Sequence, residues 1–265
     1  MARRCCACLS RFQMTSYNRI LVDAGPASTR ITLNRPDKRN AIDALLLAEL
    51  KQALAEARDA RVIVLTGAGK DFCSGADLSA LHKIRDAGVL ENMDDARNLA
   101  DLFTAMRRHP RPIVAAVRGR ALAGGCGLAS ACDLIVAAES AQFGYPEVNI
   151  GFVPAMVMAI LRRNVSEKRA FELITRGSEI GAEAAKQFGL VNQVFSDEDF
   201  ETEVTTYVRG FEKMSKSAVA LTKKLLYQID GMSFGDALET GVDVNVIARL
   251  TEDCQKGIAQ FLKKN

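Results

Sequence analysis

The chain has 265 residues, of which 48% are hydrophobic and 6% aromatic, and a formal net charge of +3. This length and composition are typical of one large globular domain, or of one domain with an appendage, and provide enough apolar side chains for a sizeable core. The small net charge and the scattered basic residues disfavour a nucleic-acid partner. No apolar run approaches the roughly 18 residues of a membrane-spanning helix, so we expect a soluble protein without membrane contact.

The first twenty residues contain four arginines and no acidic residue. This composition resembles a weak organellar transit peptide, which would make the protein mitochondrial. The alternative is a start codon assigned too early, because Met14 directly precedes the first predicted strand. We favour this second interpretation, in which residues 1–13 are disordered or absent from the native start of a cytoplasmic protein.

Cysteine usage limits the kinds of site that the chain can form. The seven cysteines are odd in number and form no repeated CxxC pairs, and the chain has two histidines. A disulfide framework and a zinc site are therefore disfavoured, and a reducing compartment fits the pattern. Cys5, Cys6 and Cys8 could bind a soft metal, but the sequence offers them no further ligands nearby. We expect no metal site.

The segment that starts at Tyr17 is predicted to form a β-hairpin. RILVD leads to a turn with glycine and proline, and TRITLNRP follows, in which Ile31 and Leu33 alternate with polar neighbours. Pro36 ends the second strand. From Ala41 onwards, apolar residues recur at helical spacing, which predicts a long amphipathic helix.

Strand, loop and helix signals alternate between Arg61 and Ala138. Short buried strands are predicted at VIVLTG, PIVAAV and LIVAA, and helices at SGADLSALHKI, DDARNLADLFTAMRR and GGCGLASACD. This alternation predicts an α/β core with sequential crossovers. From Pro154, helical patterns dominate: MVMAILRRNVSEKRAFELITRG, then GAEAAKQFGLV, then three further helices. We therefore divide the chain into a core of residues 14–200 and a helical C-terminal region of residues 201–265.

Two strand-to-helix junctions carry glycines, LTGAGKDFCSGADL and VRGRALAGGCGL. A helix N-terminus presents unpaired N–H groups and the positive end of the helix dipole. If the two junctions converge, one N–H from each could hold a developing oxyanion, as acyl-transfer and enolate chemistry require. Alternatively, the glycines only permit close packing of helix against strand, which for either junction alone is an equally good explanation.

Phosphate-binding loops are disfavoured at both junctions. In GAGKD, Lys70 is followed by Asp71 rather than by serine or threonine, and ALAGGCG does not form the dinucleotide pattern GxGxxG. We therefore expect no nucleotide cofactor.

Three sequence blocks closely resemble the crotonase, or enoyl-CoA hydratase/isomerase, superfamily: FCSGADL, GRALAGGCGLASACDLIVAA and FGYPEVNIGFVP. NRPDKRNAI and GAEAAKQFGLVNQV also fit, and the similarity extends in the family's order from about Tyr17 to the C-terminus. The resemblance implies an α/β fold with a crotonase-like ββα spiral core and a helical C-terminal region. It also implies an acyl-CoA thioester as substrate, with coenzyme A as part of that substrate rather than a cofactor.

The resemblance further implies roles for individual residues. The N–H groups of Ala76 and Gly124 would form an oxyanion hole for the thioester enolate, and Glu147 would be the catalytic acid/base. The substrate-binding residues implied are Lys38, Arg39, Ala41, Asp77, Leu78 and Gly125. The loop that begins at Lys38 would lie near the adenine end of coenzyme A. Asp77 is expected mainly to cap the helix that follows it.

The sequence departs from the two-acid hydratases at Gly127, where these enzymes have a second glutamate. Glu147 follows Tyr145 and Pro146 and precedes an apolar stretch, which predicts a half-buried carboxylate with a raised pKa, suited to a general base. A single glutamate suits proton transfer between C2 and C4, as in the family's Δ3,Δ2-enoyl-CoA isomerases. Gly127 would then leave space beside the thioester, for a bulkier acyl group or a bound water.

Hydration of a 2-enoyl-CoA with one glutamate stays open. Tyr145 or an acid within residues 85–97 could act as the second group, although these acids are better explained as a solvated helix face. A different class of function is a catalytically weak scaffold that binds acyl-CoA or RNA. Loss of Gly124 or Glu147 would have favoured such a scaffold, and both residues are present.

The C-terminal region is predicted to mediate oligomerisation. It carries apolar residues at helical spacing beyond what a peripheral helix needs: Phe234, Leu238, Val242, Val246 and Leu250. The family usually forms trimers or dimers of trimers, so the resemblance implies a homotrimer or homohexamer.

Overall fold

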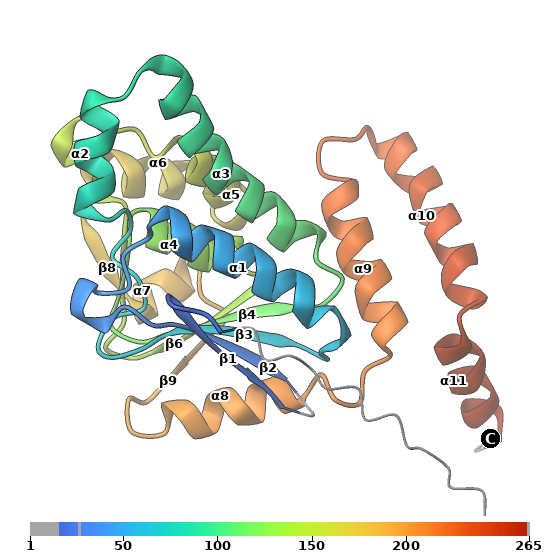
Figure 1. Cartoon of the computed structure of the whole chain (residues 1–265). Coiled ribbons are helices and arrows are strands. Elements are labelled where there is room, and N and C mark those ends of the chain that lie inside the picture. Colours follow the sequence, from blue (N-terminus) through green and yellow to red (C-terminus); the bar gives the residue numbers. More distant parts are fainter. Residues whose placement is uncertain (1–15, 26–27, 264–265) are drawn as a thin grey trace, which may run out of the picture.

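The computed structural model describes residues 16–25 and 28–263, with the side chains of Leu78, Ala80 and Leu81 left out. The expectation for residues 1–13 therefore lies outside the described residues. Two sheets and a set of helices make up the described chain (Figure 1). Within this part of the chain, no helix is both long enough and apolar enough to cross a membrane.

The main sheet has six strands in the order β1-β2-β3-β4-β6-β9. Its strands are β1 (Ile20–Ala24), β2 (Thr29–Leu33), β3 (Ile63–Gly67), β4 (Ile113–Val117), β6 (Leu134–Ala138) and β9 (Gln193–Phe195). The β1–β2 pair is an antiparallel hairpin, and the remaining neighbours are parallel. The predicted hairpin and the three predicted buried strands are confirmed.

Helices cover both faces of this sheet because the central strands are apolar on both sides. In β4, Ile113, Ala115 and Val117 join the larger core cluster, whereas Val114 and Ala116 join the smaller one. The larger cluster is covered by α1 (Ala44–Glu56), α3 (Val89–Arg108), α4 (Gly124–Ala131) and α5 (Ala155–Asn164). The smaller cluster is covered by α8 (Phe200–Arg209), which lies below the sheet in Figure 1.

A second sheet, which the sequence pattern did not predict, combines β5 (Arg120–Leu122), β7 (Gln142–Gly144) and β8 (Glu179–Gly181). β5 and β7 are parallel, and β7 and β8 are antiparallel. Each strand has three residues, too few for an alternating pattern to stand out. This small sheet nevertheless brings together the chain segments that carry the candidate site.

The remaining helices are α2 (Leu78–Asp86), α6 (Glu167–Arg176), α7 (Ala182–Gln187), α9 (Lys216–Gln228), α10 (Phe234–Arg249) and α11 (Glu252–Leu262), with short 3-10 turns η1 (Pro36–Lys38), η2 (Ala57–Asp59) and η3 (Pro146–Ile150). The helical pattern MVMAILRRNVSEKRAFELITRG forms two helices, because extended Val165 separates α5 from α6, whose N-cap residue is Ser166. Four helices, not three, follow α7 among the described residues.

The C-terminal helices form a layer beside the α/β body (Figure 1). α9 contacts α3, and α10 and α11 contact α9. α8 belongs to the body, because its Phe200, Val204 and Val208 pack on the sheet. The division into segments 14–200 and 201–265 stays a prediction.

Candidate functional site

Backbone pairing brings the two glycine-marked junctions together. Cys73 forms an isolated parallel bridge with Ala121 of β5. The Cys73 N–H donates to Arg120 O at 3.1 Å, and Leu122 N–H donates to Cys73 O at 3.0 Å. A Cβ placed on Gly75 would lie 3.3 Å from the Gly124 nitrogen. The loop before α2 and the start of α4 are therefore in direct contact.

Ala76 is held by Ile42 without using its own N–H. The Ile42 N–H donates to Gly75 O at 2.7 Å, and the Asp77 N–H donates to Ile42 O at 3.0 Å. Ala76 is the bridge partner of Ile42, so its own N–H and C=O point away from Ile42. Within the described residues, no hydrogen bond uses the Ala76 N–H.

Gly124 is the first residue of α4, and its N–H also has no partner among the described residues. The preceding Ala123 has φ 51° and ψ −129°, a conformation that costs free energy for a residue with a Cβ. Two hydrogen bonds fix it: Ala123 N–H donates to Gly144 O at 2.8 Å, and Ala123 O accepts from Gly127 N–H at 3.0 Å. The strained turn exposes the first N–H of the helix.

The structure requires glycine at position 125 but not at the adjacent position 124. A Cβ on Gly125 would lie 2.2 Å from Cys73 O, so close packing requires glycine there. A Cβ on Gly124 would meet only ordinary contacts, the nearest being Ile42 Cδ1 at 3.7 Å. Packing therefore explains Gly125 and leaves Gly124 unexplained.

Glu147 reaches the same edge of the small sheet. It lies in η3, directly after β7, and β7 runs parallel to β5, which leads to Gly124. Parallel neighbours end at one edge, so the segments that follow them are adjacent. The side chain is half-buried, and its Oε2 atom is buried without a hydrogen-bond partner in the described chain. Loss of solvent raises the pKa of Glu147 above its ordinary value, as the sequence predicted.

The expectation that Gly127 leaves open space is wrong. Gly127 is buried in α4, and a Cβ placed on it would lie 2.0 Å from Val157 Cγ1 and 3.5 Å from Phe103 Cζ. Val157, in α5, is 3% exposed. The room that a side chain at position 127 would need is therefore filled by a valine from another helix.

The groups proposed as substitutes for a second acid are poorly placed. Tyr145 is fully buried, and its hydroxyl pairs with Ser130 Oγ at 3.0 Å. Burial raises the pKa of Tyr145 well above its ordinary value. The acids of the 85–97 segment are exposed where α2 ends and α3 begins: Asp86, Glu91, Asp94 and Asp95. These positions favour the solvated helix face over a catalytic role.

The candidate substrate-binding residues lie around the same loops. Lys38 and Arg39 are exposed, and Arg39 O accepts a hydrogen bond from Ser74 N–H at 3.0 Å. Ala41 is buried, with both backbone polar groups engaged in hydrogen bonds. Leu78 begins α2, but its side chain lies outside the described residues. Contacts of these residues with a substrate stay predictions.

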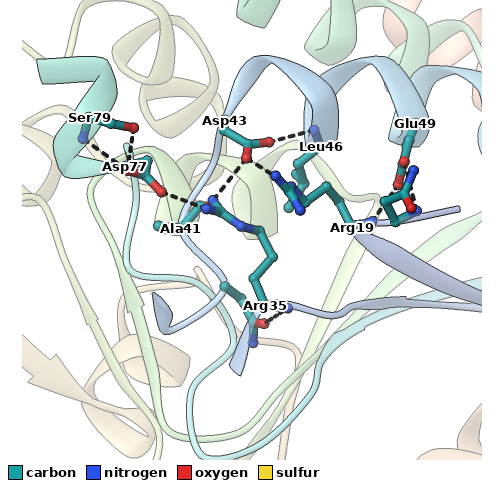
Figure 2. A network of polar contacts seen from close by, with 10 residues as sticks. Arg19, Arg35, Ala41, Asp43, Leu46, Glu49, Asp77 and Ser79 are labelled. Carbon is teal, nitrogen blue, oxygen red and sulfur yellow. Dashed lines mark hydrogen bonds and ion pairs between the residues drawn. The ribbon is translucent and has the colours of Figure 1, made fainter. Parts of the chain in front are cut away.

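Asp77 is the N-cap of α2, as predicted, with its carboxylate accepting from Ser79 N–H at 2.9 Å. Its second oxygen accepts from Arg35 at 2.7 Å (Figure 2). Arg35 was not among the residues predicted from the sequence, because one arginine at the end of a strand carries no distinguishing pattern. Among the described residues, no group of three or more histidine, cysteine or acidic side chains is arranged to bind a metal ion.

Comparison with known proteins gives consistent matches over most of the chain. The sequence model of the enoyl-CoA hydratase/isomerase family matches residues 26–265. A Thermus thermophilus protein provisionally named an enoyl-CoA hydratase is 39% identical over 237 residues, covering 88% of this chain and 94% of that protein. The mitochondrial enoyl-CoA hydratase domain-containing protein 3 of Rattus norvegicus is 32% identical, covering 88% of this chain and 78% of that protein.

The fold is also shared with solved structures. The crystal structure of an enoyl-CoA hydratase from Mycobacterium smegmatis matches with a TM-score of 0.87 and 30% sequence identity, covering 94% of this chain and 97% of the other. This likeness confirms the fold that the sequence blocks implied, including the helices at the C-terminal end.

Proposed function

Since the chain belongs to the enoyl-CoA hydratase/isomerase family, we propose that it is an acyl-CoA enzyme that moves the double bond of an enoyl thioester by proton transfer at Glu147. The observation that supports this most directly is that, among the described residues, the buried Oε2 atom of Glu147 and the N–H groups of Ala76 and Gly124 have no hydrogen-bond partner. Glu147 and Gly124 follow the parallel strands β7 and β5 at the same edge of the small sheet. A base needs such a carboxylate, and an enolate needs such donors.

The proposed reaction starts from a 3-enoyl-CoA. The Glu147 carboxylate takes a proton from C2, and the electron pair moves to the thioester oxygen, giving a dienolate. The N–H groups of Ala76 and Gly124 stabilise the negative charge on that oxygen. Protonated Glu147 then returns the proton to C4, which leaves the double bond between C2 and C3. One proton is taken and one is returned, so no cofactor is needed.

Packing at Gly127 supports isomerisation over hydration as the main reaction. Addition of water normally uses two groups, one to activate the water and one to protonate the carbon. Val157 fills the position that a second carboxylate would take from α4, and the other acids considered are exposed. Hydration is the second candidate, because relatives of 32–39% identity are named for it.

Parallel assays with a 3-enoyl-CoA and a 2-enoyl-CoA test the proposal. Glu147→Gln keeps the size of the side chain and removes the base, so isomerisation should fall by about 100- to 10,000-fold while the affinity for coenzyme A changes little. Wild-type protein inactive on both thioesters would favour the scaffold alternative. Efficient hydration that survives in Glu147→Gln would exclude the one-glutamate mechanism.

We also propose that the protein is a homotrimer or homohexamer assembled through its C-terminal helices. Along α10 and its C-cap residue, five apolar side chains at helical spacing are 51–81% exposed in the single chain: Phe234, Leu238, Val242, Val246 and Leu250. A stripe of this kind favours a second copy of the chain as its cover. Light scattering at micromolar concentration should give a multiple of the 28.8 kDa chain mass, and a monomeric mass would reject the proposal.

A further inference from the structure

Arg35 connects the two chain segments that hold Ala76. One guanidinium nitrogen, Nη1, donates to Ala41 O at 2.5 Å and lies 3.3 Å from Asp43 Oδ2. The other, Nη2, donates to Asp77 Oδ2 at 2.7 Å. Figure 2 shows these three acceptors around one guanidinium. The Arg35 side chain is 13% exposed, so water screens these contacts only weakly.

The two shortest contacts flank the Ile42–Ala76 bridge. Ala41 precedes Ile42 on one segment, and Asp77 follows Ala76 on the other. Because Arg35 bonds to both Ala41 and Asp77, it links the two segments next to the bridge. This link restrains the peptide group between Gly75 and Ala76, and the N–H of that peptide points away from Ile42. No other side chain among the described residues bonds both Ala41 and Asp77.

Asp77 is a strong hydrogen-bond acceptor for the Arg35 guanidinium. Hydrogen bonds from the Ser79 hydroxyl and N–H lower the pKa of Asp77 to about 2, with Arg35 adding to the effect. The carboxylate is therefore ionised at neutral pH, and one of its oxygens caps α2 while the other accepts from Arg35. A charge-assisted bond of this kind is shorter and stronger than a neutral one.

Arg35 is itself held in place by the loop that follows it. The side chain of Asn40 is fully buried; its oxygen accepts from Arg35 N–H at 2.9 Å, and its amide nitrogen donates to Ala68 O and Asp71 O. Both Arg39 and Asn40 have left-handed backbone conformations, with φ of 50° and 55°. The guanidinium therefore projects from a constrained backbone.

We propose that Arg35 is a positioning residue that fixes the direction of the Ala76 N–H at the thioester oxygen. The inference rests on the proposed function, in which that N–H stabilises the enolate. Hydrogen bonds to a developing charge depend steeply on geometry, and a displacement near 1 Å can cost about 100-fold in rate. Arginine suits the task, because its planar fork reaches Ala41 and Asp77 at once, whereas lysine offers one compact ammonium group.

The test compares Arg35→Gln and Arg35→Lys with a matched control, Arg19→Gln. Arg19 pairs with Asp43 at 2.9 Å in the same network but does not contact Asp77 (Figure 2). The probe is a cinnamoyl thioester of coenzyme A, whose absorption moves to longer wavelength when its carbonyl is polarised. Turnover of a 3-enoyl-CoA is measured in parallel, with kcat and KM separated.

We expect Arg35→Gln to lose most of the wavelength change and about 10- to 100-fold in kcat, with KM altered less than about threefold. Arg35→Lys should be intermediate, and Arg19→Gln should stay within about twofold of wild type in kcat. A merely stabilising role would lower the melting temperature of Arg35→Gln and leave the wavelength change of its folded fraction intact. That result, or an unchanged kcat, would overturn the proposal.

The outcomes separate this inference from the proposed function. Wild-type protein that neither polarises the probe nor turns over a 3-enoyl-CoA would reject the proposed function itself. Wild-type activity together with unchanged Arg35→Gln rejects only the role of Arg35. If Arg35→Gln does not fold, Asp77→Asn should show the same loss of wavelength change and of kcat. Asparagine can still cap α2 but, being neutral, cannot form an ion pair with Arg35. Failure of both to fold would assign Arg35 to the stability of the fold and equally reject the positioning role.

Discussion

The packing of Val157 against Gly127 gives the sharpest quantitative prediction. A methyl group at position 127 would lie 2.0 Å from Val157 Cγ1. Overpacking of this kind costs about 1–3 kcal/mol, and alanine in place of a helical glycine returns about 1 kcal/mol. Gly127→Ala alone should therefore lower the free energy of unfolding by about 0–2 kcal/mol, the balance of these two estimates.

The double-mutant cycle isolates the steric contact. Val157→Ala removes both Cγ atoms, so the nearest Val157 atom to a Cβ at position 127 becomes the valine Cβ, at 3.1 Å. In the wild-type background this truncation should cost about 1–2.5 kcal/mol of lost burial and packing. In the Gly127→Ala background it also relieves the collision, so its cost should be smaller by about 1–3 kcal/mol.

Urea denaturation of wild type, both single variants and the double variant measures this coupling energy. Additivity within about 0.5 kcal/mol would show that Val157 does not occupy the space beside Gly127, and the reasoning would fail. The catalytic counterpart uses Gly127→Glu with and without Val157→Ala. Hydration of a 2-enoyl-CoA should rise by at least about 10-fold in the double variant over Gly127→Glu alone, because only the double variant has room for the second carboxylate.

Four further predictions concern the oxyanion donors, the pH dependence of the rate, the stability of Glu147→Gln, and the packing of α9 on the α/β body. Gly124→Pro should turn over a 3-enoyl-CoA at least about 100-fold more slowly than Gly124→Ala, because only proline removes the backbone N–H at this position. Equal turnover rates in the two folded variants would reject the oxyanion role of Gly124. The value of kcat/KM should fall as the pH drops through the raised pKa of Glu147, above its ordinary 4.5, because the base must be deprotonated. Burial disfavours the charged form of Glu147 in the folded state, so Glu147→Gln should have a higher melting temperature than wild type at pH 8. The difference should disappear below pH 4.5, where the glutamate is protonated in both the folded and the unfolded state. A higher melting temperature that persists at low pH would contradict the raised pKa of Glu147. Lys223→Met should lower the free energy of unfolding by about 3–5 kcal/mol, because it leaves the Asp133 carboxylate without its buried partner at 2.6 Å, whereas exposed Lys224→Met should stay within about 0.5 kcal/mol.

Local sequence signals predicted the elements that have a long or strongly apolar pattern. The hairpin and the buried strands β3, β4 and β6 were all found, because each contributes at least five residues with continuous or alternating apolar character. The three-residue strands β5, β7 and β8 were not found, since pairing rather than propensity defines them. The break between α5 and α6 was missed because Val165 fits a helical apolar pattern although its backbone is extended.

The half-burial of Glu147 agrees with one of the two signals used to predict it, since Tyr145, two residues earlier, is fully buried. The apolar stretch after Glu147 does not contribute, because Ile150, Phe152 and Val153 are 43–69% exposed. The meaning of Gly127 could not be predicted, because the atom that fills its surroundings belongs to Val157, in another helix. The contacts of Arg35 were equally hidden, since its partners Ala41 and Asp77 come from two loops far apart in the sequence, and only the folded chain places them around one side chain.

The candidate site shows why its chemistry leaves an uneven trace in the sequence. Both proposed oxyanion donors are backbone N–H groups, which almost any residue supplies, so the sequence records only what holds them in place: the close packing at Gly125 and the bridge from Ile42 to Ala76. The proposed base, Glu147, is a side chain and is visible directly in the sequence. In the proposed function, the choice between isomerisation and hydration depends on a third feature, whether a second proton-transfer group can enter beside α4. That feature is a matter of volume, and in this chain Val157 occupies the volume. A substitution far from both donors and base in the sequence can therefore change which reaction the same donors and base support.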